Sequence, residues 1–206
     1  MRTYDGMTAG ERAAARRRRL MDAGLELFHT QGYPGTSIRA VLRRSGLQDR
    51  YFGESFPSLD ALMAAVLAEI QDEEAAGCRA AATGPGTRRE RARGMLRVLA
   101  AGVADDPRKG RVKLVESLAA GPLAANERRR GMWNLARMVE ELLLEDPPGP
   151  GTHTGVMALA IVGGVQQILL NWADGTLPLS REDVVEQGLR LFEAVAAFDG
   201  GPSARR

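Results

Sequence analysis

Apolar residues recur at every third or fourth position along most of this chain, and segments rich in glycine and proline interrupt the recurrence. The first stripe is Leu20, Ala23, Gly24, Leu27 and Phe28, which is the spacing of one face of an α-helix. No run alternates apolar and polar residues as a half-buried β-strand would. Aromatic residues, which strands favour, make up only 5% of the chain. The sequence therefore predicts an all-α fold.

The interruptions divide the chain into about nine expected helices. They are a first helix at about 11–31, two short helices that flank Gly46 within 36–56, a long helix that follows Ser58, and helices at about 88–104, 111–120, 126–144, 153–173 and 181–198. Gly32 is placed to end the first helix, and Ser58 is placed to cap the long one. We expect a three-helix head at 11–57 and a larger helical body at 58–199.

The formal net charge of the 206 residues is only +2, but residues 1–60 carry ten arginines against seven acidic residues. This basic excess at the N-terminal end is a modest signal for an anionic partner. The one cysteine, Cys78, cannot form an internal disulfide, which fits a reducing compartment. The longest apolar run, 156–170, is short for a membrane span and holds two glutamines. We therefore expect a soluble, cytoplasmic protein with no membrane partner.

The stretch TSIRAVLRRSGLQDRYFGESF, residues 36–56, reads as two short helices joined by a tight turn at Gly46. Phe52 and Phe56 are spaced to point inward, whereas polar side chains occupy the open face of the second helix. Those polar residues are Gln48, Asp49, Arg50 and Tyr51. A helix that enters the major groove of DNA needs such an unburied, hydrogen-bonding face. With the first helix as a brace, the stretch is a candidate helix-turn-helix unit.

The same region resembles the DNA-binding domain of the TetR family of bacterial transcriptional repressors. The motifs that carry the resemblance, at matching spacings, are Leu27–Phe28, Gly32–Tyr33, Thr36–Ser37–Ile38, Gly46–Leu47 and Phe56–Pro57–Ser58 followed by Leu62. The resemblance covers about a quarter of the chain. It implies a dimeric regulator that binds a palindromic operator and responds to a small molecule.

The sequence departs from the family pattern at three positions. Gln48 stands where Ser or Thr usually caps the recognition helix, so Asp49 is the candidate cap here. Gly53 replaces the usual Tyr that touches the DNA backbone, and Leu59 replaces the usual Lys. Tyr51 or the arginine run at 16–19 could recover part of the lost contact set.

Ten residues form the predicted DNA-binding set. They are Arg16, Arg17, Thr36, Ser37, Arg39, Gln48, Asp49, Arg50, Tyr51 and Gly53. Several have a structural alternative: the arginine run 16–19 can be a solvated helix face, Thr36 and Ser37 can act as helix caps, and Tyr51 can pack on the surface of the head. The start of a helix also exposes backbone N–H groups that bind anions.

No constellation in the sequence indicates an enzyme, a cofactor or a metal site. Two histidines, His29 and His153, and one cysteine are too few for most metal or nucleophile schemes. The glycines within 163–165 lie inside an apolar helix, where small residues allow close helix packing rather than phosphate binding.

The helix expected at 153–173 is apolar on nearly every side and must be covered all round. The last two helices of two chains could pack together as a four-helix bundle, which the resemblance also implies. Such a homodimer would present two recognition helices to a palindromic operator.

The helices that follow the head would enclose a ligand pocket in such a regulator. The candidate lining residues are Met63, Leu67, Met95, Leu99, Val115, Leu118, Trp133, Met138, Gln166 and Trp172. Met and Trp are more often plain core. No acidic or basic cluster points into the body, so the expected effector is a small apolar or amphiphilic molecule.

The favoured function is therefore a ligand-responsive dimeric transcriptional repressor that binds double-stranded operator DNA. The alternative is a helical ligand-binding or scaffold protein whose head has lost specific DNA recognition, with Gly53 and Leu59 as symptoms. An enzyme is the least favoured class. A gel-shift with the DNA upstream of the protein's own gene would separate the first two.

Overall fold

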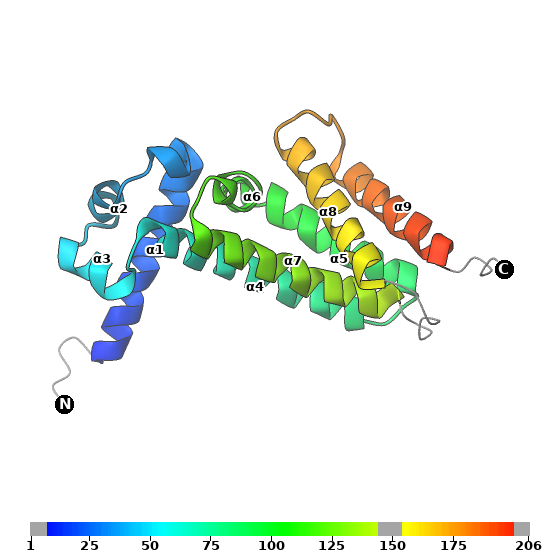
Figure 1. The fold of residues 1–206 in the computed structure, drawn as a ribbon, viewed down its shortest axis with the longest axis horizontal. Coiled ribbons are helices and arrows are strands. Elements are labelled where there is room, and N and C mark those ends of the chain that lie inside the picture. Colours follow the sequence, from blue (N-terminus) through cyan, green and yellow to red (C-terminus); the bar gives the residue numbers. More distant parts are fainter. Residues whose placement is uncertain (1–7, 144–153, 200–206) are drawn as a thin grey trace. The chain divides into compact units, whose positions relative to one another are not determined.

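The computed structural model describes residues 8–143 and 154–199, and within them it contains helices but no strand (Figure 1). The elements are α1 (Ala9–Gly35), α2 (Ile38–Ser45), α3 (Asp49–Ser55), α4 (Leu59–Thr83), α5 (Arg88–Ala104), α6 (Pro107–Leu114), the 3-10 helix η1 (Glu116–Leu118), α7 (Pro122–Leu143), α8 (Thr154–Ala173) and α9 (Arg181–Asp199). The predicted all-α fold with about nine helices is confirmed for this part of the chain. His153 lies outside the described residues.

The chain divides into two compact units. The first unit is Met1–Ile70 with Arg111–Arg128, and the second unit is Gln71–Gly110 with Arg129–Arg206. The division therefore lies within α4, whereas a boundary between 11–57 and 58–199 would place it before α4. Residues beyond α3 join the first unit because their side chains enter its core. They are Leu62, Met63, Val66, Ile70, Val112 and Ala124.

One apolar core holds the first unit together. α1 contributes Leu20 and Phe28, and the α3 region contributes Phe52 and Phe56, all of them buried. The apolar stripe predicted for the first helix therefore faces the core. Gly24 permits the close approach of α4, since a Cβ at this position would lie 3.0 Å from a Leu62 methyl carbon. Burial of large apolar side chains is the main stabilising contribution in such a unit.

The turns on either side of α2 depend on glycine. Gly46 follows α2 in the left-handed conformation with φ of 65°, which is costly for residues with a Cβ. Gly32 has φ of 73° and breaks α1 before a short turn that ends at Gly35. The predicted stop at Gly32 is thus a kink inside α1, and the chain leaves the helix three residues later.

Side-chain caps account for the starts of several helices. Ser37 Oγ accepts the backbone N–H three residues on at 3.2 Å, and Ser58 Oγ does the same at 3.1 Å. The prediction that Asp49 caps α3 is wrong. The N-cap is Gln48, which makes no side-chain capping bond, and Asp49 is the first residue inside the helix. An acid in the first turn still stabilises a helix through its dipole.

Two helices begin four residues before their expected starts, α6 at Pro107 and α7 at Pro122. The sequence reading treated both prolines as breaks, but proline is well suited to the first helical position because its fixed φ is helical and no N–H is needed there. The Asp60 carboxylate accepts the next two N–H groups after Pro122, at 2.9 and 3.1 Å. A side chain distant in sequence therefore caps the start of α7.

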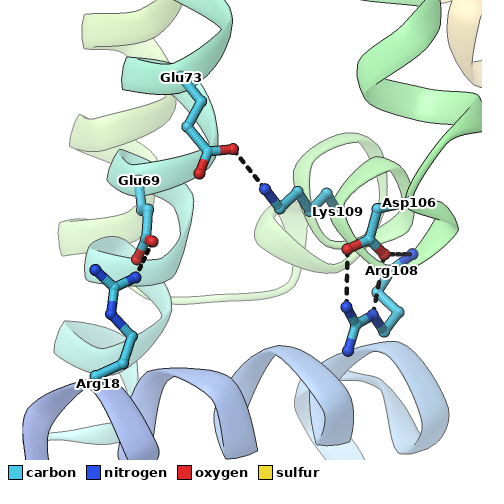
Figure 2. A network of polar contacts seen from close by, with 6 residues as sticks. All are labelled: Arg18, Glu69, Glu73, Asp106, Arg108 and Lys109. Carbon is cyan, nitrogen blue, oxygen red and sulfur yellow. Dashed lines mark hydrogen bonds and ion pairs between the residues drawn. The ribbon is translucent and has the colours of Figure 1, made fainter. Parts of the chain in front are cut away.

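In the second unit, α5, α8 and α9 pack against one another. Their buried apolar residues include Leu96, Leu99, Val103, Val162, Val165, Leu169, Leu189 and Phe192. Polar contacts also tie α6 to α4, since Lys109 pairs with Glu73 (Figure 2). By length and composition alone α8 could cross a membrane, and only 28% of its most apolar stretch is buried in this single chain. The helix thus presents an apolar face that its own unit leaves uncovered.

Candidate nucleic-acid interface

The second helix of the predicted helix-turn-helix, α3, keeps one face buried and one face open. Phe52 and Phe56 fill the core, with ring centroids 5.9 Å apart. Gln48, Asp49 and Arg50 are exposed, and so is Gly53. The structure thus places these four predicted site residues together on the outer side of one short helix.

Tyr51 is half-buried between two arginines. The Arg16 guanidinium lies 4.5 Å from the centroid of the Tyr51 ring, and the Arg50 guanidinium lies 4.7 Å from it. Arg50 Nη2 also donates a hydrogen bond of 2.7 Å to the Tyr51 hydroxyl oxygen, which is the main cause that raises the pKa of Arg50. Cation–π contacts of this kind contribute about 0.5–1 kcal/mol each at exposed sites. The stack presets the direction of the Tyr51 ring on α3.

The four consecutive arginines of α1, which we call the arginine collar (Arg16–Arg19), contact three other helices or their ends. Besides Tyr51, Arg16 approaches Glu54 at 3.7 Å, and Arg17 lies 4.3 Å from the centroid of the Phe56 ring. Arg18 pairs with Glu69 of α4 (Figure 2). Arg19 donates a 2.5 Å hydrogen bond to the Ser45 carbonyl oxygen at the end of α2. The collar thus contacts α2, the α3 region and α4, while Arg17, Arg18 and Arg19 remain exposed to solvent.

The remaining predicted DNA-binding residues lie around α2. Thr36 is buried and its hydroxyl donates to the Gly32 carbonyl oxygen at 2.7 Å, whereas Ser37 is exposed at the start of α2. Arg39 is exposed on α2. Arg43, one turn further along α2, is exposed as well.

Two of the three departures from the family pattern, Gly53 and Leu59, differ in their surroundings. A Cβ at Gly53 would meet no atom within 4 Å, so a larger side chain has room there. Leu59 is half-buried and packs against the core of the first unit. Its apolar side chain therefore has a structural use.

The turn between α1 and α2 is fastened by a residue far away in the sequence. The Glu116 carboxylate, only 5% exposed as a residue, accepts the Tyr33 N–H at 2.8 Å and pairs with Arg111 at 2.8 Å. A Cβ at Gly32 would lie 3.0 Å from that carboxylate. No local sequence pattern announces this contact, because 83 residues separate its partners.

The ten predicted ligand-lining residues are not equivalent in the structure. Met63, Leu67, Met95, Leu99 and Met138 are buried, and Gln166 and Trp172 are half-buried. Val115, Leu118 and Trp133 are 40%, 60% and 51% exposed, so they do not face an enclosed interior of this single chain. Trp172 donates its ring N–H to the Leu179 carbonyl oxygen at 2.9 Å, which ties the end of α8 to the following loop.

Comparison with known proteins agrees with this geometry. Residues 20–66 match the family model described as bacterial regulatory proteins, tetR family. No curated protein matches the chain. Similar solved structures include the fatty acid degradation regulator FadR from Bacillus halodurans, with 14% identity, coverage of 92% of this chain and 97% of that chain, and a TM-score of 0.75.

Two further solved structures widen the comparison. FadR from Bacillus subtilis, in complex with stearoyl-CoA, is 12% identical over 87% of this chain and 97% of its own, with a TM-score of 0.72. A TetR/AcrR-family regulator from Thermobifida fusca YX-ER1 is 24% identical over 93% of this chain and 100% of its own, with a TM-score of 0.63. At these identities the likeness establishes the fold.

A braced pair of short helices with an open polar face defines a helix-turn-helix DNA-binding protein. Residues 20–66 match the model of the tetR family of bacterial regulatory proteins, and the described helices have the fold of TetR-family transcriptional regulators. The family and the structural neighbours are transcription regulators and not enzymes.

Proposed function

We propose that this protein is a ligand-responsive, dimeric transcriptional repressor of the bacterial cytoplasm. The observation that carries the proposal is the exposed polar face of α3, where Arg50 and Tyr51 are preset by a stack with Arg16. Preset side chains lose less conformational freedom on binding than mobile ones. Gln48, Asp49, Arg50 and Tyr51 then reach base edges in the major groove, and the residues around the start of α2 contact phosphates.

The DNA-binding part of the proposal is tested with a gel-shift on a duplex from upstream of the protein's own gene. A duplex of the same length with scrambled sequence serves as control. The repressor proposal expects a discrete complex with the upstream duplex that survives excess scrambled competitor. Equal binding of both duplexes would favour the alternative, a helical ligand-binding or scaffold protein with degenerate DNA recognition. The open position at Gly53 supports that alternative.

Dimerisation is proposed through the outer faces of α8 and α9. One side of α9 is buried and another side carries Glu182, Glu186 and Glu193, which pair with arginines of α5. The third side is exposed and holds Gln187, Arg190, Ala194 and Ala197. On α8 the exposed positions are Val156, Ala160 and Gln167, and Gly163 has no atom within 4 Å of a built Cβ. Small residues on two neighbouring helices suit close packing against a second copy in a four-helix bundle.

The dimer is tested by size-exclusion chromatography with light scattering on Gly163→Arg. Arginine at this outward position should separate the subunits without disturbing the subunit fold. Ala80→Arg, an exposed small residue on α4, is the matched control and should remain dimeric. Gly164 and Phe192 are unsuitable targets, because a Cβ at Gly164 would lie 2.7 Å from Leu191 and Phe192 is buried. An intact Gly163→Arg dimer would place the interface elsewhere.

The effector is proposed to be a small apolar or amphiphilic molecule that lowers operator affinity. The buried Met95, Leu99 and Met138 of the second unit supply adaptable apolar surface for such a ligand. The relative from Bacillus subtilis was solved with stearoyl-CoA, which makes this molecule the natural first probe. α4 contributes residues to both units and is the candidate route for coupling. We expect a coupling free energy of about 1–3 kcal/mol between ligand and operator.

Calorimetric titration of stearoyl-CoA, with and without the upstream duplex, tests this coupling. By linkage, DNA should weaken ligand binding by the same factor by which ligand weakens DNA binding. Acyl-CoAs of shorter chain length test whether affinity follows apolar surface. Equal affinities for stearoyl-CoA in the two titrations would contradict the proposed coupling, even if the protein binds both partners.

A further inference from the structure

A buried carboxylate from a distant part of the chain holds the turn that leads into α2. Glu116 Oε2 accepts the Tyr33 N–H at 2.8 Å, and Glu116 Oε1 pairs with Arg111 at 2.8 Å. Gly32, just before Tyr33, has φ of 73° and ψ of 163°, a combination that is essentially confined to glycine. A Cβ at Gly32 would lie 3.0 Å from Glu116 Oε2. Because a buried carboxylate is costly unless its oxygens are bonded, these contacts favour one geometry of the turn.

The hydrogen bonds of this turn lead directly to the start of α2. Thr36 donates its hydroxyl to the Gly32 carbonyl oxygen at 2.7 Å and its N–H to the Tyr33 carbonyl oxygen at 3.1 Å. Ser37 follows at once as the cap of α2. Only three residues then separate the end of α2 from the start of α3. A displacement of Tyr33 would therefore shift the start of α2 and, through the short turn, the polar face of α3.

The segment that carries Glu116 is itself fixed within the first unit. Val112 precedes it and Ala124 follows it, and both are fully buried in the core of this unit. Arg128 donates a hydrogen bond of 3.0 Å to the carbonyl oxygen of Ser117, the residue next to Glu116. The carboxylate is thus attached to a packed part of the unit on both sides, so it can serve as a fixed reference for the turn before α2.

We propose that Glu116 is a positioning residue for operator recognition, which acts through the Tyr33 N–H and sets the direction in which α2 and α3 leave α1. The inference rests on the proposed function, and it adds a residue that lies outside the polar face of α3. Side chains on α3 can read bases only if the helix is held in register, to within about 0.5 Å for a preset site. Binding to phosphates alone depends on charge and carries no sequence information, so it does not need this contact.

The test separates the reach of the side chain from its charge. Glu116→Asp keeps the charge but withdraws the carboxylate by one methylene from the Tyr33 N–H, whereas Glu116→Gln keeps the reach and an oxygen acceptor but loses the charge. Val66→Ala removes buried apolar volume from the core of the same unit and is the control for reduced stability alone. Fluorescence anisotropy with the upstream and the scrambled duplex measures the affinities of each full-chain variant, and thermal unfolding gives its folded fraction at the assay temperature.

We expect Glu116→Asp to bind the upstream duplex about tenfold more weakly and the scrambled duplex as wild type does. Glu116→Gln and Val66→Ala should stay close to wild type on both duplexes. The positioning role would be overturned, with the proposed function intact, by equal losses for Glu116→Asp and Glu116→Gln, by a loss shared by both duplexes, or by a Glu116→Asp chain that is unfolded at the assay temperature. Wild-type protein without preference for the upstream duplex would instead refute the proposed function, and this inference with it.

Discussion

Helices α1 and α5 begin alike and then use their arginines differently. Each starts with a threonine cap and a glutamate three residues on that bonds back to the cap. α1 then carries four consecutive arginines, Arg16–Arg19, which reach α2, the α3 region and α4. α5 carries Arg89, Arg93 and Arg97 at intervals of four, and all three pair with acidic residues of α9.

The difference follows from the geometry of a helix. Consecutive residues are turned by about 100°, so a contiguous run points in several directions and can touch several elements. Residues four apart lie on the same side of a helix and can pair with only one neighbouring helix. Besides the ion pairs of Arg16 and Arg18, the collar meets aromatic rings and a backbone carbonyl. The α5–α9 contacts are ion pairs alone, between exposed or partly exposed side chains, and such pairs contribute little to stability. The spacing of the arginines along a helix therefore decides whether they contact several neighbouring helices or only one.

The largest expected loss of stability concerns an arginine whose acidic partner is buried. Glu116→Ala removes the acceptor of the Tyr33 N–H and the partner of Arg111. We expect the free energy of unfolding to fall by about 2 kcal/mol, because the partly buried Tyr33 N–H loses its charged acceptor. Urea unfolding measures this loss. Glu116→Gln keeps an oxygen acceptor and should lose less, and equal stability of Glu116→Ala and wild type would rule out the fastening role.

The second largest loss of stability is expected for a variant of the arginine collar. Arg19→Gln removes the guanidinium that donates to the Ser45 carbonyl oxygen at the end of α2. We expect a loss of about 1 kcal/mol, as for a partly exposed charge-assisted hydrogen bond. Arg39→Gln removes an exposed arginine whose side chain has no polar partner within residues 8–143 and 154–199, and it should leave unfolding unchanged. If the two variants unfold at the same urea concentration, the collar does not brace the first unit.

The ion pairs between α5 and α9 should contribute less to the free energy of unfolding. Arg93 pairs with Glu186 at 2.5 Å, but both side chains are partly exposed. We expect Arg93→Gln to cost at most about 0.5 kcal/mol, and the cost to shrink in 1 M salt, where the screening length falls to about 3 Å. Urea unfolding at low and high salt gives both values. A loss that exceeds the effect of Arg19→Gln would reverse the comparison between the two helices.

The smallest effect concerns the shared caps. Hydrogen bonds from Thr8 lower the pKa of Glu11, and those from Thr87 lower the pKa of Glu90. A carboxyl whose pKa is lowered in the folded state contributes stability above its unfolded pKa of about 4.3, and this contribution is lost as pH falls through the folded pKa. Melting temperatures between pH 6 and pH 3 should fall less steeply for the double variant Glu11→Gln, Glu90→Gln. An unchanged slope would show that the caps do not titrate.

Local patterns predicted the helices well and the long-range polar contacts poorly. The stripe of Leu20 and Phe28 and the cap at Ser58 depend on neighbouring residues, so the sequence states them directly. The starts of α6 and α7 were missed because proline was read only as a helix breaker. The bonds of Glu116 and Asp60 join residues far apart in the chain, and only the fold brings them together.

The open face of α3 was likewise readable from the sequence, while the state of its side chains was not. Alternation of inward phenylalanines and outward polar residues gave Gln48, Asp49, Arg50 and Tyr51. The stacking of Tyr51 between Arg16 and Arg50 depends on the placement of α1 against α3, which no spacing rule supplies.

The central claim is that the outer face of α3 reads DNA. Its most direct test is the affinity of Tyr51→Ala, Tyr51→Phe and wild type for the upstream duplex in the presence of scrambled competitor. We predict that Tyr51→Ala loses about 1–3 kcal/mol of binding free energy, as a lost base-edge contact would. Tyr51→Phe, which keeps the ring between the two arginines, should lose less. Wild-type affinity of Tyr51→Ala and of Arg50→Ala would contradict the account.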